Sequence, residues 1–93
     1  MKHKIFSVFD TAAGAFITPF QMPTLAMAKR TFQQCALDEN HQFCKNPEDY
    51  TLFELGEFED KTAKYELCKT PISHGLAIEY QYTPEKADLK EVV

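Results

Sequence analysis

The sequence predicts a single α+β domain in which one helix packs on one face of an antiparallel sheet of four or five strands. Three observations support this fold class. The 93 residues are too few to fill two hydrophobic cores, and 44% of them are hydrophobic, which is enough for one. Period-two alternation of apolar residues recurs in several short segments, whereas helical periodicity appears in one. These segments follow one another as β-β-α-β-β, and a further segment near the end would supply the fifth strand.

The first two strands form a predicted hairpin. Residues 2–10 are rich in β-branched and aromatic side chains, and Phe6 and Val8 share one side of the pleat, so we expect a strand that is largely buried on both faces. A turn containing glycine leads to a second arm over residues 15–20. Because proline cannot donate a hydrogen bond to a sheet, Pro19 indicates that this arm is an edge strand or ends there.

The predicted helix covers residues 25–37. Apolar side chains recur there at steps of three and four residues, and Thr24 is suited to cap the first turn. The opposite face of the helix carries Lys29, Arg30 and two glutamines.

The second half of the sheet follows an irregular connection over residues 41–49. Residues 50–58 and 64–69 alternate as strands joined by a turn, and Gly56 inside the first predicts a bulge or a close backbone approach. Residues 76–82 alternate strictly, which predicts the fifth strand, with a short helix as the alternative reading.

We place the domain at residues 1–83 and expect residues 84–93 to form a polar, flexible tail. A helix of about thirteen residues is roughly 20 Å long, which is too short to cover every large apolar side chain of the sheet. We therefore expect either a curled sheet or a homodimer. The side chains in question are Phe6, Val8, Phe16 and Phe53.

The charge of −4 is distributed unevenly along the chain. Residues 1–37 carry +3, residues 38–66 carry −6 and residues 67–93 carry −1. The pI near 5.3 argues against general phosphate binding, because nonspecific affinity for nucleic acid depends on Lys and Arg. Any contact with DNA must therefore use a local face.

The chain has no apolar run near the eighteen or so residues that span a bilayer, and its first residues are unlike a signal peptide. We therefore expect a protein that stays where it is made and does not contact a membrane. Three cysteines without close pairing fit thiols in a reducing cytosol.

No catalytic or metal-binding motif rises above chance. Ser73 adjoins His74, but sequence neighbours on a strand point to opposite faces, which disfavours a nucleophile and base. Cys35, His41 and Cys44 offer three zinc ligands in principle, yet they lack tight Cys pairs, so two packed thiols and a surface imidazole are favoured. We expect no enzymatic activity, no cofactor and no metal.

The best candidate surface for single-stranded DNA combines a cationic side with an aromatic ring on which a base could stack. Stacking is worth roughly 1 to 3 kcal/mol per base. The cations would track the phosphates, although most Phe residues in a domain of this size belong to the core. The candidate residues are Lys2, His3, Lys4, Lys29 and Arg30, with a ring from Phe6, Phe16 or Phe20.

Three segments together resemble the small non-structural protein of gokushoviruses, which are single-stranded DNA phages of the Microviridae. They are Lys4–Asp10 (KIFSVFD), Pro19-Phe20 leading into a helix with Ala28–Phe32 (AKRTF), and Pro47–Phe58 (PEDYTLFELGEF). The resemblance covers roughly residues 2–60. It implies an accessory protein made in the cytoplasm of the infected bacterium and absent from the capsid, with a role in genome handling. It supplies no catalytic residues.

We therefore expect a non-enzymatic accessory protein that assists genome replication or packaging through weak contacts with single-stranded DNA or with phage replication or assembly proteins. The alternative is a protein-interaction module with no nucleic-acid contact. Its sheet face would mediate self-association or dock a phage or host protein. Salt-dependent binding of oligo-dT would separate the two.

Overall fold

The computed structural model describes residues 1–81. The order of its elements agrees with the predicted α+β class. The strands are β1 (Lys2–Asp10), β2 (Ala15–Phe16), β3 (Phe20–Met22), β4 (Tyr50–Glu59) and β5 (Lys64–Leu76). The helices are α1 (Leu25–Leu37), α2 (Gln42–Lys45) and α3 (Ala77–Tyr80).

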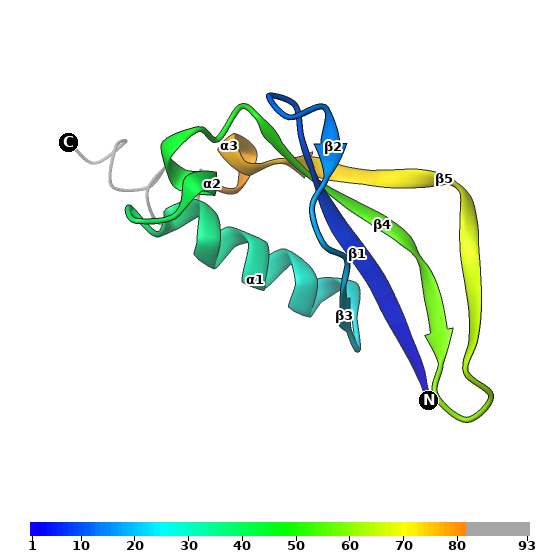
Figure 1. The fold of residues 1–93 in the computed structure, drawn as a ribbon. Helices are drawn as coiled ribbons and strands as arrows, with labels where there is room; N and C mark the ends of the chain where they lie inside the picture. The colour runs from blue at the N-terminus through cyan, green and yellow to red at the C-terminus, as the bar shows by residue number, and fades with distance from the viewer. Residues whose placement is uncertain (82–93) are drawn as a thin grey trace.

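All five strands belong to one curled antiparallel sheet. Its order is β2-β1-β4-β5, and β3 pairs with β1 on the same edge as β2. The second hairpin arm is therefore a single edge strand that is broken between β2 and β3, over residues 17–19. Pro19 favours this break because it has no N–H to donate to the sheet. In Figure 1, the amino terminus and the β4–β5 turn lie at one end of the molecule, and α2 and α3 lie at the other.

The core lies between α1 and one face of the sheet. Phe6 and Val8 of β1 and Leu52 of β4 are almost fully buried against Ala28 and Phe32 of α1. Thr24 caps the helix as predicted, because its Oγ1 accepts a hydrogen bond from the backbone N–H three residues later at 3.2 Å.

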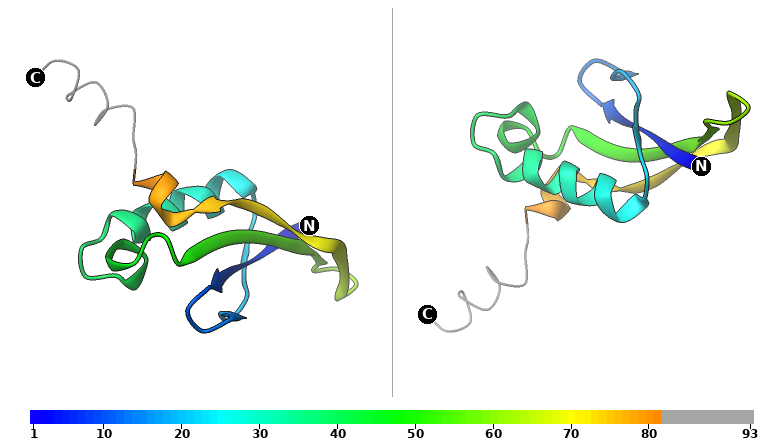
Figure 2. Two further views of the ribbon diagram at one scale, coloured as in Figure 1. Left: turned by 90° about the horizontal axis from the view of Figure 1, so that it is seen from above. Right: turned by 90° about the horizontal axis from the view of Figure 1, so that it is seen from below.

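Strands β4 and β5 continue past α1 as a ribbon, which the two views of Figure 2 show. Gly56 permits a close backbone approach within this ribbon. A Cβ atom at this position would lie 2.2 Å from the carbonyl oxygen of Glu66 and 2.8 Å from the Cα of Leu67. The β1–β4 pairing shifts register between Ile5 and Phe6, next to Gly56, so the predicted bulge is confirmed.

The expected strand over residues 76–82 is wrong within the described residues, and the short-helix alternative is correct. Strand β5 extends to Leu76, and α3 follows. Gly75 turns the chain with φ +105°, a conformation that favours glycine. In a helix, Ala77 and Tyr80 share one side, and both pack on the core, where the Tyr80 ring lies 5.0 Å from that of Phe32.

Two further details differ from the sequence predictions. The connection over residues 41–49 contains α2, which the side chain of His41 caps by accepting a hydrogen bond from the N–H of Phe43 at 3.0 Å. Strand β5 is longer than predicted because Pro71 lies on an edge strand, where a missing donor is tolerated. The predicted tail over residues 84–93 lies outside the described residues.

Candidate interaction surface

The two lysines of β1 lie next to acidic residues of β4. The Nζ atom of Lys4 is 3.4 Å from Oε2 of Glu54 and 3.8 Å from Oε1 of Glu57. Lys2 approaches Glu57 at 3.9 Å. These lysines and carboxylates share the side of the sheet that faces α1, as pairing and alternation require. The acids offset the positive charge that the sequence places on β1.

His3 belongs to a second ionic cluster at the end of the sheet. Its Nε2 lies 3.1 Å from Oδ2 of Asp60, and the amino group of Met1 donates hydrogen bonds to Asp60 at 2.8 Å and to Glu59 at 2.9 Å. The bond to Asp60 and then that to Glu59 raise the pKa of the amino group. The same amino group lowers the pKa of both carboxyls. This cluster also pairs its cations with acids.

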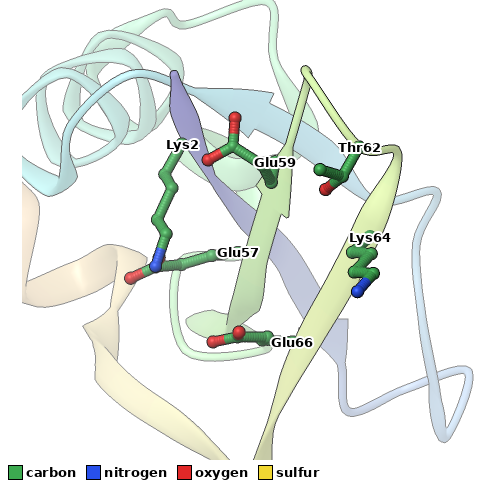
Figure 3. A pocket seen from close by; sticks show the side chains of 6 residues that line it. All are labelled: Lys2, Glu57, Glu59, Thr62, Lys64 and Glu66. Carbon is green, nitrogen blue, oxygen red and sulfur yellow. The ribbon is translucent and has the colours of Figure 1, made fainter.

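A hollow of 100 Å³ opens beside Lys2 and is lined by side chains of β1, β4, β5 and the β4–β5 turn. Figure 3 shows Lys2 reaching toward Glu57, with Lys64 farther away on β5. Two ammonium groups and three carboxylates make this hollow mixed in charge. Within residues 1–81, no group of three or more His, Cys, Asp or Glu side chains is placed to hold a metal ion. The lining residues are Lys2, Glu57, Glu59, Thr62, Lys64 and Glu66.

Lys29 and Arg30 are exposed on α1. Neither forms a salt bridge with a residue in the part of the chain that the structure describes. The five predicted cations therefore divide into two groups. Lys2, His3 and Lys4 on β1 lie beside acidic side chains, whereas Lys29 and Arg30 lie apart from them on α1.

The three candidate rings differ in accessibility. Phe6 is fully buried and stacks on Phe20 with ring centroids 5.8 Å apart, so Phe6 offers no surface to a base. Phe20 is half-buried against the core. Phe16 is 44% exposed and packs edge-on against Phe9 and Phe53. Of the three, Phe16 is the most accessible ring.

The face of the sheet turned away from α1 is apolar, and we name it the open face. Seven of its residues follow from strand alternation and cross-strand pairing with Ser7, Gly56 and His3, and Leu55, which lies at the register shift, lines a hollow together with Ile5 and Leu67. The most exposed are Tyr65 at 61% and Leu67 at 69%. The open face consists of Ile5, Phe9, Phe16, Phe53, Leu55, Phe58, Tyr65 and Leu67.

A second hollow, of 440 Å³, indents the open face beside the two most exposed side chains. The strands β1, β3, β4 and β5 all contribute to its wall. Apolar side chains dominate it, because only Gln21 and the hydroxyl of Tyr65 bring polar groups among its lining side chains. Its lining residues are Ile5, Pro19, Phe20, Gln21, Leu55, Tyr65 and Leu67.

The groups considered for catalysis or metal binding have other structural partners. His74 lies 3.1 Å from Oε1 of Glu54, whereas the hydroxyl of Ser73 accepts a hydrogen bond from the backbone N–H of Gly75. Burial, followed by the charge of Asp38, raises the pKa of Cys35, which disfavours a reactive thiolate. These contacts give structural roles to His74 and Ser73.

The open face includes residues that the sequence-based DNA surface omitted. The sequence places Tyr65 and Leu67 in a predicted strand over residues 64–69 but indicates no site for them. Two features of the sequence indicate such a face. The sheet has more large apolar residues than one helix can cover, and apolar residues alternate in two adjacent strands. These features indicate an apolar face without identifying its partner.

Residues 3–80 match the family described as Phage ORF5 protein. Among the described residues, the match covers every helix and every strand apart from the first residue of β1. No curated protein and no solved structure matches the chain.

Proposed function

Because the chain belongs to the Phage ORF5 protein family, we propose that it is a non-enzymatic accessory protein that acts through protein contacts made by its open face. The more specific assignment is to a gokushovirus-like phage with a single-stranded DNA genome, and to the cytoplasm of its bacterial host. The resemblance of residues 4–10 and 47–58 supports that assignment. The step served would be genome replication or packaging.

The observation that carries this proposal is the contrast between the two faces of the sheet. On the α1 side, Lys2 and Lys4 lie within 4 Å of carboxylates, which would compete with phosphates. On the open side, Tyr65 and Leu67 are each more than half exposed. Contiguous exposed apolar surface is typical of a site that binds another protein.

Photocrosslinking tests this function. A benzophenone amino acid is placed at Leu67 on the open face, and in a matched control at Met27, which is 48% exposed on α1. In infected cells we expect a crosslinked polypeptide from position 67 and none from position 27. Equal crosslinking from both positions, or none from position 67, would contradict the proposal.

Single-stranded DNA binding is the second candidate, and it is favoured by Lys29 and Arg30 of α1, which are exposed and form no salt bridge with residues 1–81. A fluorescence titration with oligo-dT at low and moderate salt measures it. If these residues contact phosphates, binding weakens steeply with salt and is lost in the double variant Lys29→Gln/Arg30→Gln. The first proposal predicts no binding at low salt.

A further inference from the structure

We propose that the open face is the contact surface between two copies of this chain, packed sheet against sheet about a twofold axis. This inference rests on the proposed function, since it names the partner that the open face binds. The second copy is identified from the charge, shape and extent of the face.

Charge favours a second copy. Two identical chains, each with a formal charge of −4, approach best through a surface free of acids. The eight residues that define the open face are uncharged, and the titratable His3 of the same side lies at its end, where it contacts Asp60 at 3.1 Å. The neighbouring strand positions that carry Glu54, Glu57 and Glu66 point to the other side of the sheet. A strongly charged partner would find no complementary charge on the open face. An identical face carries no charge that would need a complement.

The shape of the open face is suited to self-complementarity. A twofold contact requires one surface to present both a projection and a recess, because the same patch occurs on each side. Tyr65 and Leu67 project from β5, and they border the hollow of 440 Å³ on the same face. A half-turn about an axis through the face places the projection of each copy over the hollow of the other.

The extent of the open face suits a dimer of ordinary size. A fully exposed aromatic side chain presents about 200 Å², so the exposed parts of Phe16 and Tyr65 amount to about 200 Å². Leu67 and the half-buried members raise the apolar total to the order of 400 Å². A standard interface buries about 800 Å² per partner, of which roughly 60% is apolar.

Pairing through the outer edge of β5 is a poorer alternative for the same partner. Pro71 lies in the middle of this strand and lacks an N–H donor. Lys64 and Lys69 also lie along the strand, and edge lysines oppose the addition of another strand. The copies therefore meet through their faces and not through their edges.

Light scattering and sedimentation equilibrium of the full chain from about 1 to 200 µM test the proposal. We expect a mass of twice 10.7 kDa for the natural sequence and a dimer dissociation constant at least about 30-fold higher for Leu67→Glu. The matched control Met27→Glu replaces a side chain 48% exposed on α1 and leaves the dimer unchanged. Circular dichroism checks that each variant folds.

A second measurement does not require a variant. In a mixture of labelled and unlabelled chains, isotope-filtered nuclear Overhauser effects should join the Tyr65 ring of one copy to open-face methyl groups of the other. A single-chain mass at 200 µM, or a dimer that Met27→Glu dissociates and Leu67→Glu does not, would overturn the proposal. Contacts of Tyr65 with residues 82–93 of its own chain would also overturn it.

The two proposals fail in different ways. A monomer whose position 67 crosslinks to another phage or host polypeptide rules out the second copy and supports the protein-contact function. A chain that crosslinks to no polypeptide and has a single-chain mass contradicts both.

Discussion

Replacing Gly56 by alanine should loosen the ribbon formed by β4 and β5. The new Cβ would lie 2.2 Å from the carbonyl oxygen of Glu66, whereas ordinary contacts begin near 3.4 Å. Because the obstacle is backbone, the two strands must separate by about 1.2 Å, the difference between these distances. The pairing of Gly56 with Leu67 would then be lost at the base of the open face.

The expected cost combines two destabilising terms and one that offsets them. Overpacking of this kind costs about 1–3 kcal/mol, and a lost backbone hydrogen bond adds about 1 kcal/mol. The lower entropy of the unfolded alanine chain returns about 0.4–1 kcal/mol. The free energy of unfolding should therefore fall by about 1–3.5 kcal/mol, which lowers the Tm of a domain of this size by roughly 4–28 °C.

Urea unfolding and amide hydrogen exchange measure this effect. We expect faster exchange around Leu67 and little change in α1. Gly14→Ala is the matched control, because φ is +67° at Gly14 and nothing lies within 4 Å of the added Cβ. That variant should lose about 1 kcal/mol without local opening of β5. A Tm for Gly56→Ala within 2 °C of the natural sequence, with unchanged exchange at Leu67, would refute the reasoning.

Three further changes have definite expected outcomes. Ala63 lies in the turn after β4 with φ +58°, so Ala63→Gly should raise the free energy of unfolding by up to about 1 kcal/mol; a lower Tm would contradict this. The buried hydroxyl of Ser7 donates to the carbonyl of Ile17 at 2.7 Å, so Ser7→Ala should lower the free energy of unfolding in urea by about 1–3 kcal/mol. An unchanged free energy of unfolding would show that this bond has no structural role. The amino terminus lowers the pKa of Asp60 below its ordinary 3.8, so this ion pair stabilises the fold above that pH and its contribution is lost as the pH falls through the lowered pKa. Acetylating the amino group should return the pKa toward 3.8 in a carbon-13 titration, and an unchanged pKa would show that other groups lower it.

The sequence predicts what short-range patterns determine. Thr24 caps α1, Phe6 and Val8 share the buried side of β1, and Gly56 marks the close approach of two strands. Each of these follows from residue chemistry and periodicity within a few positions. The reversal at Gly75 into α3 does not, because tertiary packing on the core outweighs local alternation.

The charges of the candidate surface depend on distant pairing. Nothing near Lys4 in the sequence indicates that Glu54 and Glu57 lie beside it, since the register of β1 on β4 joins segments about fifty residues apart. The sequence therefore indicates a cationic side of which the fold offsets the β1 part, while Lys29 and Arg30 of α1 form no salt bridge within residues 1–81. The burial of Phe6 agrees with the general tendency of Phe to occupy the core.

The central position of β1 has a consequence for synthesis on the ribosome. Its partner β4 follows after 40 residues at the Asp10–Tyr50 pair and after 57 at the Lys2–Glu59 pair. Until β4 leaves the exit tunnel, one hydrogen-bonding edge of β1 has no neighbouring strand. The pairing available to β1 until then is the hairpin with β2 and β3. Strand β1 therefore gains its β4 neighbour only after residue 59 has been made, and a long pause before that residue would prolong exposure of an aggregation-prone strand.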